Sequence, residues 1–143
     1  ADYELRAARM NRIMQELAPL LRGHHLVVME GPAYGVKGAV GVFDRAGLWW
    51  DAYRKLRKGG FLVGVVPPTL LKRYATGKGN ANKTGVVAAV TRLCPDIEIA
   101  DDNQADALIL RLMGLHQLGT PAVRVPKSHT TALDGCAWPA RMQ

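Results

Sequence analysis

Three carboxylates and one lysine-containing loop are the residues of this chain whose types and spacing could do chemistry. Glu30 closes the apolar run 26–29, and Asp102 and Asp106 lie four residues apart at the start of an apolar helical pattern. The segment 77–83, between them in the sequence, contains two lysines. Carboxylate oxygens are the ligands that hard divalent cations prefer, and cations and lysines both hold phosphate. The combination is typical of a metal-dependent nuclease.

Length and composition indicate one folded domain. The chain has 143 residues, of which 48% are hydrophobic and 22% charged, and this length supports a substantial core. No apolar run approaches the roughly 18 residues of a membrane span, and the charges among the first residues are unlike a signal peptide. Cys94 and Cys136 form no CxxC pair, which argues against a disulfide framework and a zinc site. We therefore expect a cytoplasmic protein with no membrane partner.

The charge balance favours a polyanionic partner. Lys and Arg number 19 against 12 Asp and Glu, a formal net charge of +7. Such an excess attracts nucleic acid through its phosphates. Lys72, Arg73, Lys78 and Lys83 fall within one short segment, which indicates a binding face, although a solvated basic surface would give the same pattern.

Apolar periodicity and capping residues predict alternating helices and strands. Buried strands are expected over 26–29 and 61–66, because both are short, continuous apolar runs. Helices are expected from Asp2 to about Gly23, over about 38–58, from Pro68 to Tyr74, from Lys83 to Leu93 with Asn82 as N-cap, and from an N-cap at Asp102 to Leu118. No periodicity follows residue 120. We therefore expect a domain over 1–120 and an extended tail over 121–143, held by Leu133 and Trp138.

The order of these elements implies an α/β layer structure with parallel strands. Two strands that both resemble buried central strands make a poor sheet by themselves. The sequence therefore lacks strands that its own pattern requires.

Four motifs connect the chain with a known family. They are VVMEGP at 27–32, VVPPTLLK at 65–72, GKGNANK at 77–83 and DNQADAL at 102–108. Each is weak alone, but all four in this order and at these separations form a specific signal. Over about 26–115 the chain resembles the RuvC-type Holliday-junction resolvases of the RNase H-like superfamily, and most of all those of actinobacterial viruses.

The resemblance implies a mixed sheet flanked by helices, a homodimer, and paired nicks in four-way DNA junctions. The implied chemistry is two-metal hydrolysis with Mg²⁺ or Mn²⁺. The family motifs place metal-binding carboxylates at Glu30 and Asp106, and the family lysine at Lys83. They also imply a viral protein that acts in the cytoplasm of a bacterial host.

The chain departs from the family pattern in two ways. Family members begin with a three-stranded meander whose first strand bears an aspartate, whereas this chain starts at the helix. We therefore expect an N-terminally incomplete nuclease domain, a separate segment that completes the sheet, or a degenerate relative. Bacterial resolvases also carry an acid at the position of Asn103. The acid here is Asp102, which shares a helical face with Asp106 and becomes the expected third ligand, with Asn103 as the alternative.

The expected function is a divalent-metal-dependent endonuclease that cuts branched DNA. The expected catalytic residues are Glu30, Asp102, Asp106 and Lys83, of which the three carboxylates bind metal. The expected DNA contacts are Tyr34, stacking on an unpaired base, with Lys72, Arg73, Lys78, Asn80, Asn82 and Lys83.

Simpler interpretations stay open. Asp102 could be only an N-cap, and Glu30 could pair with a lysine. Asp106 could be structural, Lys83 solvated and Tyr34 merely packed. The protein could be a non-catalytic RNase H-like DNA-binding or assembly subunit, or a flap or fork nuclease with the same site. Trp49 and Trp50 are expected in core or dimer packing, and His116 and His129 suggest no role.

Overall fold

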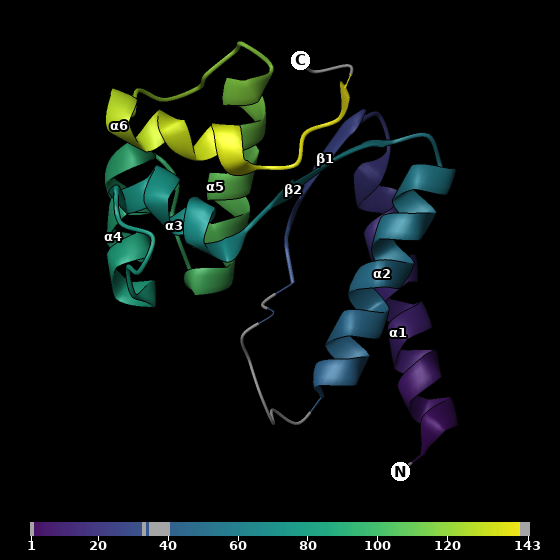
Figure 1. Ribbon diagram of the computed structural model, residues 1–143. Coiled ribbons are helices and arrows are strands. Elements are labelled where there is room, and N and C mark those ends of the chain that lie inside the picture. The colour runs from purple at the N-terminus through teal and green to yellow at the C-terminus, as the bar shows by residue number, and fades with distance from the viewer. Residues whose placement is uncertain (1, 33, 35–40, 141–143) are drawn as a thin grey trace. The chain divides into compact units, whose positions relative to one another are not determined.

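The computed structural model describes residues 2–32, 34 and 41–140, which form an α/β fold with helices flanking a small parallel sheet (Figure 1). The chain folds as two compact units, and the strands pass through both. One unit comprises Ala1–Val27 with Tyr34–Val63, and the other comprises Val28–Ala33 with Gly64–Gln143. Among the described residues, no helix has both the length and the apolarity needed to cross a membrane.

The first unit is built around two helices. Helix α1 covers Tyr3–Leu17 and continues as a 3₁₀ helix, η1, over Ala18–Leu21, while α2 covers Val42–Lys58. Asp2, where the first helix was expected to begin, is the N-cap of α1, because its carboxylate accepts a hydrogen bond from the Leu5 amide at 3.1 Å. Arg6 of α1 forms an ion pair with Asp44 of α2. The expected start of the second helix at residue 38 lies outside the described residues.

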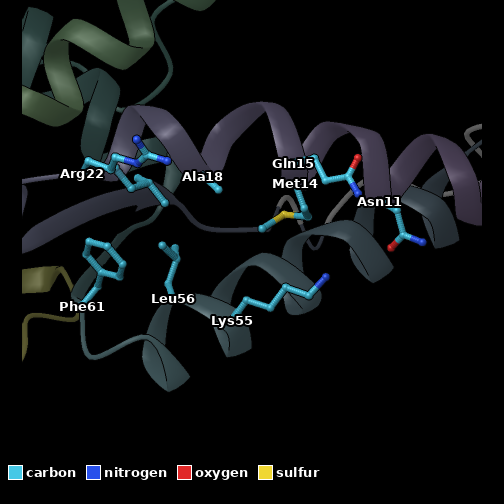
Figure 2. Close-up of a pocket in the computed structure, with 9 residues that line it drawn as sticks. Asn11, Met14, Gln15, Ala18, Arg22, Lys55, Leu56 and Phe61 are labelled. Carbon is cyan, nitrogen blue, oxygen red and sulfur yellow. The ribbon is translucent and has the colours of Figure 1, made fainter.

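A hollow of about 420 Å³ lies in this unit beside α1 and α2 (Figure 2). Its apolar lining comes from both helices, from η1 and from Phe61, with Met14, Ala18, Leu21 and Leu56. No described residue of α1 is buried. Much of the apolar surface of α1 is therefore uncovered.

Two parallel strands form the sheet, as predicted. Strand β1 covers Leu26–Glu30 and pairs with β2, Leu62–Val66. In the first unit the Leu62 amide donates to the carbonyl of His25 at 2.8 Å, and in the second the Gly31 amide donates to the carbonyl of Val66 at 2.7 Å. The other edge of β2 forms an antiparallel bridge between Val65 and Ala137.

The main core lies in the second unit, among three helices. These are α3 over Pro68–Thr76, α4 over Lys83–Leu93 and α5 over Asp102–Gln117. The largest fully buried side chains belong to these helices and to β2: Val66, Leu71, Tyr74, Val90, Ile109, Leu112 and Met113. Helix α4 matches its predicted bounds, and the side-chain oxygen of Asn82 caps it by accepting from the Gly85 amide at 2.8 Å.

The extended tail predicted after residue 120 is wrong for much of its length. Lys127–Thr130 form helix α6, and Thr131–Gly135 form a 3₁₀ helix, η2. These turns are too short to show helical periodicity in the sequence. The predicted anchors hold, because Leu133 is buried and the Trp138 ring lies against Gly64 of β2. A nuclease domain over 1–120 stays a prediction.

Candidate metal and DNA site

The second unit contains the three predicted carboxylates and two lysines that interact with them. Glu30 is the last residue of β1, while Asp102 and Asp106 lie on the first turns of α5. Lys72 lies on α3, and Lys83 is the first residue of α4. All three carboxylate residues are partly buried. Four separate elements thus supply one cluster of charges.

Glu30 lies within electrostatic reach of Asp106. Burial raises the pKa of Glu30, the negative charge of Asp106 raises it further, and Lys72 opposes both effects. A carboxylate at the end of a half-buried strand loses part of its hydration, which disfavours the charged form. The strand end and the helix therefore direct two acids toward the same place.

Asp106 connects this pair to the third carboxylate. Its pKa is raised by burial first and by the charge of Asp102 second, while Lys72 and Lys83 act in the opposite direction. Charge interactions therefore connect Asp106 with both of the other acids, and two lysines offset them. Lys72, expected only as a DNA contact, is one of the two cations that balance the acids.

The structure separates helix capping from the candidate ligand. Asp101 is the N-cap of α5, since its carboxylate accepts from the Gln104 amide at 2.8 Å. The predicted cap at Asp102 is wrong by one residue, as is common at helix boundaries. The Asp102 carboxylate instead lies 3.3 Å from the ammonium of Lys83. Asp102 is thus available for a role other than capping.

The three carboxylates suit a hard divalent cation that takes only some of its ligands from the protein. Within the described ranges, no three His, Cys, Asp or Glu side chains are grouped closely enough to hold a metal ion. Mg²⁺ is commonly bound by one or two carboxylates, with waters and substrate phosphates as the remaining ligands. Glu30 with Asp106, or Asp106 with Asp102, fits that mode. After burial, repulsion from a neighbouring acid is the next cause of the raised pKa of Glu30 and of Asp106, and a bound cation would offset that repulsion.

The basic loop over 77–83 is held at its start by the end of α3. Gly77 adopts a φ of +83°, the left-handed conformation that ends many helices. The Thr76 hydroxyl lies 2.8 Å from the carbonyl of Lys72 and accepts from the Lys78 amide at 3.1 Å. A side chain at Gly79 would approach the carbonyl of Thr69 to 3.3 Å. The loop therefore folds back closely on α3.

The remaining predicted DNA contacts are exposed. Arg73, Lys78, Asn80 and Asn82 all face solvent, and Tyr34 is 88% exposed. The side-chain oxygen of Asn82 serves as the cap of α4. The charge interactions that join the carboxylates involve Lys72 and Lys83, so these exposed residues lie outside that cluster.

No family model matches the chain. A segment of 61 residues is 36% identical to the crossover junction endodeoxyribonuclease RuvC of Zymomonas mobilis, and it covers 43% of this chain and 36% of that protein. The chain thus matches little more than a third of the length of this relative.

The fold is similar to that of the Thermus thermophilus RuvC structure. The TM-score is 0.59, and the alignment covers 80% of this chain and 72% of that chain at 20% identity. The fold is therefore of the RNase H-like class. The resemblance to RuvC-type resolvases, predicted from four short motifs, is confirmed by both comparisons. A particular closeness to viral resolvases stays a prediction.

Proposed function

We propose that this protein is a divalent-metal-dependent endonuclease that resolves four-way DNA junctions by paired nicks. The observation that carries the proposal is the set of three acids, Glu30, Asp106 and Asp102, connected by charge interactions and offset by Lys72 and Lys83. The similarity to a protein named crossover junction endodeoxyribonuclease supports the substrate class.

Glu30 and Asp106, with Asp102, would hold Mg²⁺ or Mn²⁺ as carboxylate ligands. A divalent ion there would supply an activated water and stabilise the leaving oxygen of the phosphodiester. Lys72 favours the ionised, ligating form of both Glu30 and Asp106. Lys83 pairs with Asp102 in the absence of DNA and, because 84% of its side chain is exposed, it can reach a phosphate instead.

The exposed basic residues would bind the DNA backbone. Arg73 and Lys78 face solvent on α3 and the loop that follows it, where phosphate contacts would fix the position of the strand to be cut. Asn80 and Asn82 would add hydrogen bonds from the same loop. Tyr34, almost fully exposed, would stack on a base that is unpaired at the branch point.

Paired nicks require two sites, and the exposed face of α2 is a suitable interface for a homodimer. Phe43 is 89% exposed and Trp50 is 52% exposed. Phe43, Ala46, Trp50 and Tyr53 recur at helical spacing and so lie on one face. Large exposed aromatic side chains on one helical face commonly mark a protein interface. Two copies would bury these rings together.

A further strand-forming segment would complete the sheet. Among the described residues, β1 pairs only with β2, and a further strand could add to the other edge of β1. The uncovered apolar side of α1 and the hollow beside it offer a surface for such a segment (Figure 2). The resemblance to the family assigns one more metal-binding aspartate to this strand.

A non-catalytic DNA-binding subunit is the second candidate, and one observation favours it. The described residues contain no ready group of three metal-ligating side chains. A flap or fork nuclease would use the same site as a resolvase. In each case the expected location is the cytoplasm of a bacterial host.

Cutting and binding of a synthetic four-way junction, measured side by side in Mg²⁺, test the proposal. The protein should be joined to a strand that carries the additional aspartate, and this chain alone should cut much less. Glu30→Gln and Asp106→Asn should abolish cutting while junction affinity persists, because phosphate contacts carry most of that affinity. Full cutting by Asp106→Asn would refute the nuclease assignment, and binding without any cutting would establish the second candidate.

A further inference from the structure

His129 joins α6 to the end of α3, 55 residues earlier in the chain. The Nδ1 atom of its ring lies 3.0 Å from the backbone carbonyl of Tyr74. A carbonyl can only accept, so Nδ1 carries the proton and donates. This hydrogen bond serves a carbonyl in the last turn of α3, where helices leave acceptors unsatisfied.

The same ring lies directly against the first residue of the basic loop. A Cβ atom placed on Gly77 would lie 2.8 Å from Nε2 of His129, closer than real Cβ contacts. Gly77 is also the C-cap of α3, and its amide donates to the carbonyl of Arg73 at 2.8 Å. His129 therefore contacts the loop at the point where its direction is set.

Both partners of this contact are held in place. Tyr74 is fully buried, and its hydroxyl lies 3.1 Å from Nδ1 of His116 on α5. The His129 amide donates to the carbonyl of Pro126 at 2.9 Å, which fixes the first turn of α6. The ring thus bridges a rigid helix end and a rigid turn.

We propose that His129 is a positioning residue for DNA binding, acting through the basic loop over 77–83. Its hydrogen bond and its packing on Gly77 set the direction in which the loop leaves α3. That direction determines where Lys78 meets the DNA backbone and where Lys83 begins α4. The role of His129 in DNA binding rests on the proposed function, because the basic loop belongs to the same site.

The test compares three variants of His129. One keeps a hydrogen-bond donor, one keeps an aromatic ring, and one keeps neither. His129→Asn keeps a donor near the position of Nδ1, His129→Phe keeps a ring without a donor, and His129→Ala removes both. Binding of a labelled four-way junction is measured in Ca²⁺, without cutting, over a range of salt concentrations. We expect His129→Phe and His129→Ala to flatten the log-log salt dependence by about 0.9, the change for one phosphate that is no longer neutralised, and to weaken binding about tenfold. His129→Asn should keep most of the wild-type salt dependence and most of the wild-type affinity.

His116→Phe is the matched control, because it removes a hydrogen bond from the same tyrosine without touching the loop. It should leave the salt dependence unchanged. An equal effect in His116→Phe and His129→Phe would show general destabilisation and overturn the proposal.

A measurement without DNA separates the role of His129 from the proposed function. Backbone amide signals of 77–83 should shift in His129→Phe and return toward the wild type in His129→Asn. Unchanged loop signals in His129→Phe would overturn the positioning role even if the protein binds junctions. Shifted signals in a protein that binds no DNA would refute the proposed function and leave the control of loop geometry by His129 standing.

Discussion

The ammonium of Lys83 lies 3.3 Å from a carboxylate oxygen of Asp102, joining the first residue of α4 to the first residue of α5. Exposed ion pairs of this kind contribute little to stability, because water and salt screen them. The pair instead places an exposed cation beside Asp102 and within charge interaction of Asp106, where an incoming phosphate can compete for it.

Replacing Lys83 should therefore separate stability from activity. In Lys83→Met the free energy of unfolding should change by less than about 0.5 kcal/mol, since 84% of the side chain is exposed. Junction cutting should fall by about a hundredfold, as when one group that stabilises transition-state charge is removed. Chemical denaturation and single-turnover cutting measure the two effects. A large loss of stability with unchanged cutting would make the ion pair structural.

The adjacent aspartates should affect different properties: Asp101 should affect stability, and Asp102 should affect cutting. Asp101→Ala removes the cap of α5 and should cost about 1 kcal/mol of stability with little effect on cutting. Asp102→Asn should leave stability within about 0.5 kcal/mol and reduce cutting. Unfolding and cutting of both variants should be measured together. A loss of cutting in Asp101→Ala together with a loss of stability alone in Asp102→Asn would show that Asp102 has no part in the site.

The raised pKa values of Glu30 and Asp106 predict a specific pH dependence. Their folded pKa values lie above 4.5 and 3.8 respectively, so the folded state binds more protons than the unfolded state in that window. These two groups therefore favour folding most at the acidic end, and their contribution falls as pH rises through the folded pKa values. Glu30→Gln and Asp106→Asn should each raise the thermal midpoint at neutral pH.

Thermal unfolding of the wild type and both variants from about pH 4 to 7 measures this effect. The gain in midpoint over the wild type should increase with pH. Adding Mg²⁺ should raise the midpoint of the wild type more than that of Asp106→Asn, because the ion stabilises the state that binds it. A midpoint difference that does not change with pH would contradict the raised pKa values of these two acids.

The exposed basic residues near the site should determine the salt dependence of DNA binding. Arg73→Ala with Lys78→Ala should reduce the log-log slope by about 0.9 for each phosphate that the variant no longer neutralises. Arg92→Ala with Arg111→Ala removes the same charge from exposed positions of α4 and α5 and serves as the control. Equal slopes for the two double variants would show that net charge, rather than this face, binds the DNA.

Local sequence signals were sufficient for most elements of the fold. Helix α4 was predicted with its bounds because Asn82 is a strong N-cap and Cys94-Pro95 stops the helix. The cap of α5 was misplaced by one residue, because Asp101 and Asp102 are equally good caps in sequence. The short helices after Pro126 were missed, because their stability comes from burial of Ala132 and Leu133 rather than from a repeating pattern.

Less of the candidate site could be predicted from the sequence alone. Residue type and spacing singled out the carboxylates, and the family resemblance added their metal-binding role. The charge interaction of Glu30 with Asp106, more than 70 residues later, depends on the tertiary fold. Lys72 was expected as a DNA contact, but its charge interaction with both Glu30 and Asp106 depends on where the fold places α3. His129 gave no signal, since its partner Tyr74 lies 55 residues away.

Titration of Mn²⁺ into the isotope-labelled protein, followed by NMR, tests the central claim most directly. If a cation binds at this cluster, through Glu30 with Asp106 or through Asp106 with Asp102, the amide signals of all three residues should broaden together at low Mn²⁺. That joint broadening should disappear in Asp106→Asn and persist in Asp101→Ala. Broadening spread over unrelated acids such as Asp51 and Asp134, or broadening at Asp102 that leaves Glu30 unaffected, would contradict a shared site and the nuclease proposal with it.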